Sequence, residues 1–369
     1  MKKKLFFMLT YMNVGGTEKA MLNLLETIPK SEYEVTLFLM EKKGEFMSYI
    51  PDWINVEVLE DYKILKPLIM DPPFSLVKKY LVEGKICFAV GIALWHVIFK
   101  ITKNRFGYYK YILKKYPIRK ERYDVAIAYA GPQDFITTFV LEKVKAEKKV
   151  QWIHFDVSKC GFNPEFAKAV YPKYDKIFVV SEYAEKELVK LVPNVKNKVE
   201  VRHNVVSKEI CRKQAKGLSG FHDTFDGYRI LTVGRLSEEK GQDMIPEILV
   251  RLKERGMKVR WYLVGEGSLE GKLKKAAAEL SLEEDLVFLG LQTNPYPFYQ
   301  DCDLYVQTSR HEGYCITIAE AMAFDKYIIS TDVAGAREQL PEKRIAACNS
   351  NSLCDMILEF WKNEGKRNA

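Results

Sequence analysis

Two glutamates flank an otherwise apolar stretch in the last third of the chain. Glu312 and Glu320 lie eight residues apart in the sequence RHEGYCITIAEAMA, residues 310–323. A helix from about Cys315 to Ala323 would be apolar on nearly every side, so we expect it to be buried. Burying a carboxylate is costly unless it is paired or hydrogen-bonded. Glu320 therefore needs a partner, either a protein group, as in a structural ion pair, or the hydroxyls of a ligand.

The loop in front of this predicted helix holds the other carboxylate. DLYVQTS, residues 303–309, has the pattern of a strand, so Glu312 lies in a strand-to-helix loop. Helix N-termini bind anions such as phosphate, and a carboxylate beside one can hold sugar hydroxyls. The spacing thus predicts a site for a ligand that carries both groups.

Two cations bracket a second loop of the same kind. The predicted strand ILTVG is followed by RLSEEKG, in which Arg235 and Lys240 precede a helix and suit a diphosphate. The next strand ends in LVGEGSLEG, again with glycines before a helix. The sequence contains no GxxxxGK[ST] loop, which excludes a P-loop ATPase. The loops of this half also lack a full GxGxxG with an acidic ribose-binding residue, which argues against a dehydrogenase.

Strand-like and helix-like segments alternate along the chain, as is typical of parallel α/β sheets. The first predicted strand leads into TYMNVGGTEKA, where Gly15 and Gly16 allow a tight turn and close backbone approach to a ligand before a helix. A plain turn is an equally good interpretation of this glycine pair. A polar, glycine-containing stretch places the domain linker at about 205–227. We expect two doubly wound, Rossmann-like domains, residues 1–205 and 206–369, to face each other across a cleft, with ligands beyond the carboxyl ends of the strands.

Composition and cysteine usage indicate a soluble intracellular protein. Of the 369 residues, 47% are hydrophobic and 29% charged, as in ordinary globular proteins. The seven cysteines form no CxxC pair and no cluster with histidine, which favours a reducing cytosol and argues against a structural zinc site. The N-terminal MKKKLFFMLT imitates a signal peptide, but its apolar run is short, so we interpret it as a first strand.

Positive charge is concentrated in residues 63–122, which hold 14 basic and 3 acidic side chains. The apolar run Ile86–Phe99 is too short to span a bilayer. It is followed by Tyr108, Tyr109, Tyr111 and Tyr116, interleaved with lysines. A membrane-surface contact and a core helix beside a solvated basic face both fit this pattern. Nucleic acid is not expected as a partner, because no recognition motif accompanies the charge.

These motifs, in this order, resemble glycosyltransferase family 4, retaining enzymes of the GT-B fold. The resemblance covers about residues 228–341 and includes GRLSEEKG, LVGEGSLE, FLG, the E-x7-E of Glu312 and Glu320, and TDVAGAREQL. The first half matches more thinly, through GGTEKAMLNL, WIHFD, VVSEY and VRHNVV. In the family the last helix usually crosses back to domain one, and residues 352–361 are the segment in position to do so.

The resemblance implies roles for individual residues. Arg235 and Lys240 would neutralise the diphosphate of a nucleotide-sugar, favoured as a UDP-sugar, and Glu312 would hold sugar hydroxyls. His154 would reach the donor sugar from domain one. Without the resemblance, the local sequence favours a core histidine at this position. Glu320 would hold the ribose. The donor-binding set would be Gly15, Gly16, Gly234, Gly265, Gly267, Gly313, Tyr314, Cys315, Ile316 and Glu320.

The resemblance also implies a reaction. A hexose or N-acetylhexosamine would pass to a glycan acceptor by same-face attack within a short-lived ion pair, without a covalent intermediate or cofactor. Asp301 and Asp303 form a D-x-D pattern that binds metal in the GT-A fold, but we interpret both as loop and cap residues and expect no metal. The acceptor is expected to be lipid-linked, at the cytoplasmic face of the cell membrane, in cell-surface polysaccharide synthesis. A sugar-nucleotide epimerase and a catalytically idle subunit of a transferase complex are the alternatives.

Overall fold

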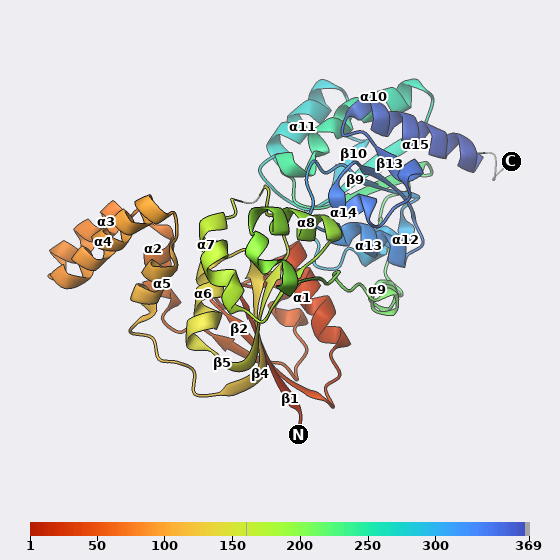
Figure 1. Ribbon diagram of the computed structural model, residues 1–369. Helices are drawn as coiled ribbons and strands as arrows, with labels where there is room; N and C mark the ends of the chain where they lie inside the picture. The colour runs from red at the N-terminus through yellow and green to blue at the C-terminus, as the bar shows by residue number, and fades with distance from the viewer. Residues whose placement is uncertain (160, 366–369) are drawn as a thin grey trace. The chain divides into compact units, whose positions relative to one another are not determined.

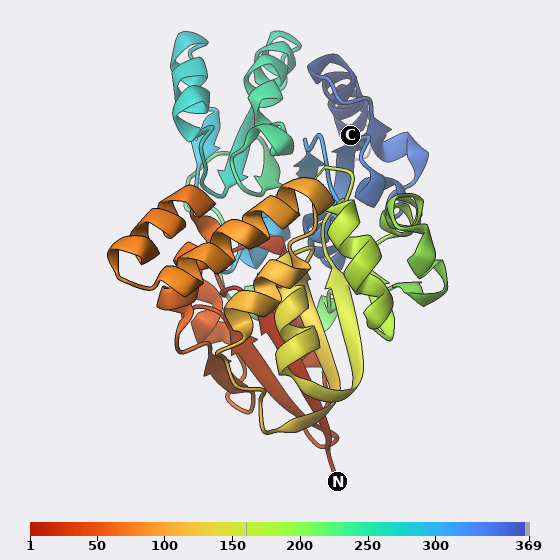
Figure 2. The same cartoon turned by 60° about the vertical axis from the view of Figure 1, so that its left-hand side comes forward.

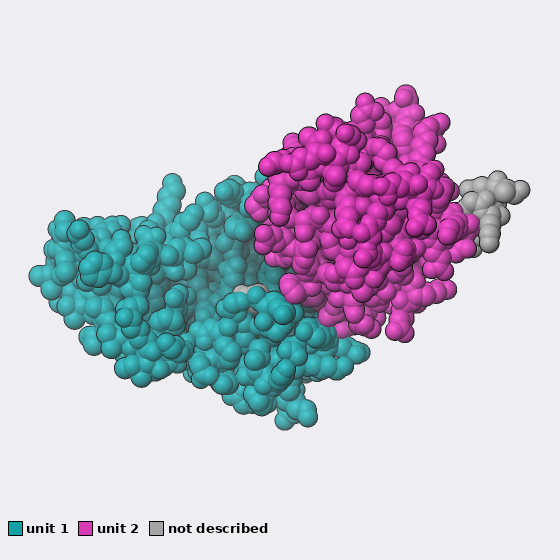
Figure 3. Space-filling view, turned by 90° about the horizontal axis from the view of Figure 1, so that it is seen from above, with its two compact units in different colours: residues 1–203 teal, residues 204–369 magenta. Residues whose placement is uncertain are grey.

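A computed structural model of the protein describes residues 1–159 and 161–365. Its internal contacts divide the chain into two compact units, residues 1–203 and 204–369, which Figure 3 shows in separate colours. The division falls two residues before the predicted boundary. We call these parts unit 1 and unit 2 and describe each by itself.

Among the described residues of unit 1, seven parallel strands form one sheet in the order β3-β2-β1-β4-β5-β6-β7. Strand β1, the third of the seven, is apolar from Leu5 to Leu9 and buried from Phe6 to Leu9, as in a strand covered on both faces. The strands are β1 (Lys3–Leu9), β2 (Tyr33–Leu39), β3 (Asn55–Val58), β4 (Arg122–Gly131), β5 (Lys145–Ile153), β6 (Lys176–Val179) and β7 (Val199–Val201). The helices are α1 (Gly16–Thr27), α2 (Tyr62–Met70), α3 (Pro73–Val82), α4 (Ile86–Thr102), α5 (Phe106–Leu113), α6 (Asp134–Lys143), α7 (Pro164–Val170) and α8 (Glu182–Leu191).

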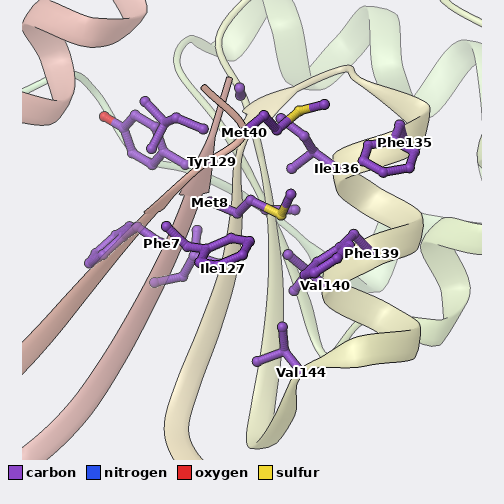
Figure 4. Packing of buried hydrophobic residues seen from close by; sticks show 14 of the residues in the cluster. Phe7, Met8, Met40, Ile127, Tyr129, Phe135, Ile136, Phe139, Val140 and Val144 are labelled. Atoms are coloured by element: carbon purple, nitrogen blue, oxygen red, sulfur yellow. The ribbon is translucent and has the colours of Figure 1, made fainter. Parts of the chain in front are cut away.

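Helix α6 shows how the core of unit 1 is built. Figure 4 shows Phe139 and Val140 of this helix turned toward Met8 of β1 and Ile127 of β4. The ring of Phe139 also stacks on Phe38 of β2, with centroids 5.5 Å apart. Burial of such side chains is the main stabilising contribution to the sheet.

Among the described residues of unit 2, six parallel strands form a sheet in the order β10-β9-β8-β11-β12-β13. The strands are β8 (Tyr228–Val233), β9 (Val259–Val264), β10 (Leu286–Phe288), β11 (Leu304–Gln307), β12 (Tyr327–Thr331) and β13 (Ile345–Ala346). The helices are α9 (Lys208–Ala215), α10 (Ile245–Glu254), α11 (Glu270–Glu279), α12 (Tyr296–Asp301), α13 (Ile316–Ala323), α14 (Ala334–Arg337) and α15 (Ser350–Gly365). Both sheets confirm the predicted doubly wound architecture, with helices on their faces (Figure 1).

One prediction about the connections needs correction. The predicted linker at 205–227 contains helix α9, which packs on α12 and α13 and therefore belongs to the body of unit 2. The predicted C-terminal helix is present as α15 and packs on α10, β12 and β13 of its own unit, and its docking on unit 1 stays a prediction. Leu353 and Ile357 on its inner side are buried there.

The strand order places one special position in each sheet. In unit 2 the chain adds β9 and β10 on one side of β8 and then returns to add β11, β12 and β13 on the other side. The strand order therefore reverses between β8 and β11. The corresponding position in unit 1 lies between β1 and β4. Ligands of such sheets bind where the loops after these two strands diverge.

The basic segment forms helices α2 to α5, with α3 and α4 side by side as a hairpin (Figures 1 and 2). The interpretation of Ile86–Phe99 as a core helix is wrong for much of its surface, because only Ala89 and Ile92 of α4 are buried. The tyrosines are instead packed inside: Tyr109 is buried, and Tyr108 donates a hydrogen bond to the carbonyl of Leu68 at 2.6 Å. No helix in the described part of the chain is long and apolar enough to cross a membrane.

Candidate active site

The loops after β8 and β11 bring together two predicted catalytic residues. The ammonium of Lys240 donates to Glu312 Oε1 at 2.6 Å, although 72 residues separate them in the chain. Burial lowers the pKa of Lys240, but the adjacent Glu312 carboxylate raises it more, so the pKa stands above its usual value. Arg235, at the carboxyl end of β8, has an exposed side chain. A cation and a carboxylate therefore meet at the point where the strand order reverses.

A short polar network orients Glu312 from behind. Gln307, the last residue of β11, donates its amide to Glu312 Oε1 at 2.9 Å and to Ser309 Oγ at 2.7 Å. Ser309 donates to the same Oε1 at 2.6 Å. The amide oxygen of Gln307 in turn accepts from Tyr305 at 2.6 Å and Thr317 at 3.0 Å. Lys240, Gln307 and Ser309 thus all donate to Oε1 of Glu312, and together they fix the carboxylate in one orientation.

Sequence reasoning missed Gln307 and Ser309. Both lie in the predicted strand DLYVQTS, where polar side chains stand among buried apolar ones. Gln307 is 3% exposed, and Ser309 is fully buried. A buried polar side chain at the carboxyl end of a parallel strand, close before a loop glutamate, was the available signal.

Backbone contacts hold the Lys240 loop against the β11 loop. The hydroxyl of Thr308 donates to the carbonyl of Lys240 at 2.7 Å. Gly241 takes a positive φ of 66°, and a Cβ there would lie 2.1 Å from the carbonyl oxygen of Thr308. A larger residue would push the two loops apart, so Gly241 is required for the Lys240–Glu312 pair.

Two of the predicted donor-binding glycines, Gly265 and Gly267, serve close packing between loops, whereas a Cβ on Gly234 would meet no atom within 4 Å. A Cβ on Gly265, whose φ is 137°, would lie 2.1 Å from the carbonyl oxygen of Gly234. A Cβ on Gly267 would lie 2.2 Å from that of Leu236. The glycines thus let the loop after β9 press against the loop that carries Arg235. Their contact with a donor stays a prediction.

The loop before α13 has the predicted strand-to-helix geometry, with one difference. Gly313 and Tyr314 are half-buried in this loop, and Cys315 is the buried cap residue. The backbone N–H of Ile316, one of the predicted donor-binding residues, donates to the carbonyl of Tyr314 at 3.0 Å and is therefore already hydrogen-bonded within the loop. Burial raises the pKa of the Cys315 thiol well above its usual value, so this cysteine stays neutral.

Glu320 has the partners that its burial requires. Its two carboxylate oxygens accept from the hydroxyls of Tyr296 and Tyr299, each at 3.2 Å. Both tyrosines lie on α12, a six-residue helix that the sequence reading did not include. Protein donors thus stabilise the buried carboxylate, and its contact with a ribose stays a prediction.

The predicted site residues of unit 1 follow the carboxyl ends of β1 and β5 in their own sheet. His154 follows β5 and is mostly buried, with its ring centroid 4.3 Å from that of Tyr129. Gly15 and Gly16 begin α1, but the φ of Gly15 is −164°, an extended value that any residue adopts. Close approach of a ligand to these glycines stays a prediction. A Cβ on Gly16 would meet no atom within 4 Å.

The D-x-D residues have backbone partners. Asp301 accepts from the N–H of Gly220 and Asp303 from that of Arg229, each at 2.8 Å. Across the described residues, no group of three His, Cys, Asp or Glu side chains is arranged to hold a metal ion. Metal independence stays a prediction.

Comparison with known proteins identifies the family of the second half of the chain. Residues 224–369 match the family described as glycosyl transferases group 1. Unit 2 therefore carries a group 1 glycosyltransferase domain. Lys240, Glu312 and Glu320 lie within the matched residues, and the predicted glycosyltransferase membership is confirmed at the level of group 1. Membership of family 4 stays a prediction.

Two curated relatives point the same way. An uncharacterized glycosyltransferase of Methanocaldococcus jannaschii is 31% identical over 185 residues, which cover 47% of this chain and 44% of that protein. The Campylobacter jejuni N-acetylgalactosamine-N,N'-diacetylbacillosaminyl-diphospho-undecaprenol 4-alpha-N-acetylgalactosaminyltransferase is 28% identical over 214 residues, 54% of this chain and 57% of that protein. The matches thus span about half the length of these two relatives.

The fold comparison extends to the whole chain. The crystal structure of Anabaena HepE in complex with UDP and glucose has a TM-score of 0.72, at 17% identity, and the match covers 99% of this chain and 91% of HepE. The glycosyltransferase domain of unit 2 therefore belongs to a chain with the predicted GT-B fold.

Proposed function

We propose that this protein transfers a hexose or N-acetylhexosamine from a nucleotide-diphospho-sugar, with a UDP-sugar favoured, to a glycan acceptor. The observation that carries the proposal is the Lys240–Glu312 pair at the strand-order reversal of unit 2. The group 1 family and the GT-B fold support glycosyl transfer. The binding of UDP by HepE supports a uridine nucleotide.

The geometry suits an electrostatic mechanism. Lys240 and the exposed Arg235 would neutralise the diphosphate and stabilise the charge that develops as it departs. Glu312, fixed by Gln307 and Ser309, would hold the sugar hydroxyls. Anomeric configuration would be retained by attack from the departing side, with the leaving phosphate accepting the proton of the acceptor hydroxyl. On this mechanism Glu312 is a clamp, and no covalent glycosyl-enzyme forms.

The acceptor we propose is a lipid-linked glycan at the cytoplasmic face of the cell membrane, in cell-surface polysaccharide synthesis. The Campylobacter jejuni relative is named for a diphospho-undecaprenol-linked acceptor. The 14 basic residues of segment 63–122 also suit an anionic surface, where each contributes roughly 1 kcal/mol of attraction. A peripheral enzyme at this surface would meet its acceptor in the plane of the membrane.

A thermal-shift panel of nucleotide-sugars, followed by turnover assays, tests the proposal. We expect a uridine diphosphate sugar to raise the melting temperature, and Arg235→Ala to weaken its binding by about 1–3 kcal/mol. Incubation with donor alone distinguishes an epimerase, which would convert the donor sugar without an acceptor. Binding of no nucleotide-sugar, or turnover of none with any glycan acceptor, would instead favour an idle subunit.

A further inference from the structure

One side of helix α4 presents a row of exposed aliphatic side chains. The row consists of Ile86, Val90, Leu94, Val97 and Ile101, which follow one another at intervals of three or four residues. This spacing places all five on the same side of the helix. Leu94 is 57% and Ile101 78% exposed. A single exposed leucine is ordinary, but a row of this length marks an interaction surface.

The other side of α4 is already committed to packing. The helix packs on α3 and α5, and Ala89 and Ile92 are buried. A Cβ on Gly91 would lie 2.0 Å from the hydroxyl oxygen of Tyr111 on α5. These close contacts fix the rotation of the helix, so the aliphatic row is held outward.

The neighbouring helix α3 also exposes large apolar side chains. Phe74 and Val82 of α3 are each 83% exposed. Exposed basic side chains accompany the aliphatic ones on both helices and just after them, namely Lys78, Lys79, Lys85, Lys100, Lys103 and Arg105. An apolar row among basic side chains matches the cross-section of an anionic membrane surface, with its acyl chains and its phosphate groups.

We propose that the α3–α4 hairpin lies flat in the interfacial layer of an anionic phospholipid membrane, with the aliphatic row of α4 among the acyl chains. A 17-residue helix is about 26 Å long, enough to hold five such side chains at one depth. This inference deepens the proposed function and rests on its lipid-linked acceptor. It changes the mode of contact from tyrosines and lysines of α5 to aliphatic side chains of α4.

The positive charge of the hairpin indicates that its partner is anionic lipid and not a second copy of the chain. Pairing two hairpins would bring together two basic surfaces, since residues 73–102 hold four lysines and one glutamate. An anionic surface attracts the same charges that would repel each other in a dimer. The hairpin is therefore complementary to anionic lipid and not to itself.

Co-sedimentation of the full chain with vesicles tests the proposal. The vesicles are phosphatidylcholine with and without about one third phosphatidylglycerol. We expect binding to the anionic vesicles that weakens but persists at 1 M salt, since charge attraction is screened there and apolar contact is not. The double variant Leu94→Gln/Val97→Gln, which leaves the net charge unchanged, should bind about tenfold more weakly.

A matched control lies in unit 2. Leu218 and Leu280 are exposed to a similar degree, and Leu218→Gln/Leu280→Gln should bind vesicles like the unmodified chain. Both variants replace exposed side chains, and equal melting temperatures establish that they fold. Absence of vesicle binding at low salt, equal binding by the α4 variant, or a dimer that this variant dissociates would overturn the proposal.

The same samples separate this proposal from the proposed function. Nucleotide binding at unit 2 is followed by the thermal shift with UDP, which the α4 variant should leave unchanged. Vesicle binding without a thermal shift by UDP would support the membrane contact and contradict the proposed donor site. A UDP shift without vesicle binding would do the reverse.

Discussion

The site loops of unit 2 and the α3–α4 hairpin of unit 1 use charge in opposite ways. In unit 2 the Lys240 ammonium is matched by Glu312, and hydrogen bonds from Gln307 and Ser309 fix the carboxylate. In the hairpin, basic side chains outnumber acidic ones and stand beside exposed aliphatic groups. A fixed, paired charge suits recognition of one ligand geometry, whereas an excess of positive surface charge suits a broad anionic surface.

The strongest test of this contrast removes one partner of the Lys240–Glu312 pair. We expect Lys240→Ala or Glu312→Ala to lower kcat/KM by roughly 10²–10³, the range for losing one preorganised electrostatic contact to a transition state. The double variant should cost little more than either single one, because the residues act as a unit. Steady-state kinetics with the identified donor measure this.

A second ion pair of unit 2 provides the control. Lys274 and Glu270 form an exposed pair on α11 at 2.7 Å. Such pairs contribute little, so Lys274→Ala should leave kcat/KM unchanged. A Lys240→Ala enzyme within twofold of the unmodified one would show that the pair is structural.

The orienting role of Gln307 can be separated from nucleotide binding. Gln307→Leu removes an amide donor to a carboxylate, an interaction worth about 1.5–3 kcal/mol. We expect kcat/KM to fall about tenfold or more while the Kd for UDP changes less than twofold, because Gln307 contacts Glu312 and neither cation. Gln292→Leu, which loses a hydrogen bond to the carbonyl of Leu289, is the matched control. Equal losses in both variants would contradict an orienting role.

The strand-to-helix loops could be predicted from the sequence, but most of the side-chain contacts between elements could not. Alternation of apolar strands and helices was enough to place Arg235, Lys240 and Glu312 at carboxyl strand ends. The strand order that joins Lys240 to Glu312 is a tertiary property, and it entered the sequence reading only through resemblance. The tyrosine partners of Glu320 were missed because α12 is short and begins with YPF, which gives no helical period.

The sequence did not reveal the exposed aliphatic row on α4, because apolar residues also occupy the other sides of this helix. Phe88, Ala89 and Ile92 fill the remaining sides of the helix with apolar residues, so the sequence reads as apolar all round and fits a buried helix. Packing on α3 and α5 covers only one side. Periodicity cannot show which apolar face lacks a protein partner, and only the contacts reveal it.

A half-buried carboxyl group at the start of α6, a helix that packs on α5, gives unit 1 a pH-dependent stability. Burial raises the pKa of Asp134 from 3.8 to about 7, and the nearby Arg105 guanidinium offsets only part of this increase. Between pH 4 and 7 the unfolded chain has released this proton while the folded chain retains it. The free energy of unfolding therefore decreases as pH rises through this window.

Asp134→Asn should remove that dependence. We expect its melting temperature to equal that of the unmodified protein near pH 4 and to exceed it by a few degrees at pH 8, where the charged carboxylate is disfavoured. Melting curves from pH 4 to 8 measure the difference. Asp71→Asn, at an exposed position before α3, serves as the control. A difference that stays constant with pH would contradict the assignment.

The smallest expected effect concerns the D-x-D residues. Asp303 immediately precedes β11, whereas Glu312 follows its carboxyl end, so the aspartates lie at the opposite end of the strand from the site. Their carboxylates accept backbone N–H groups, a role that the amide oxygen of asparagine can take over. We therefore expect transfer to proceed at full rate in excess EDTA and in Asp301→Asn/Asp303→Asn. If EDTA abolished turnover and manganese or magnesium restored it, charge neutralisation by Arg235 and Lys240 would be insufficient, and a cation would have to share the diphosphate with them.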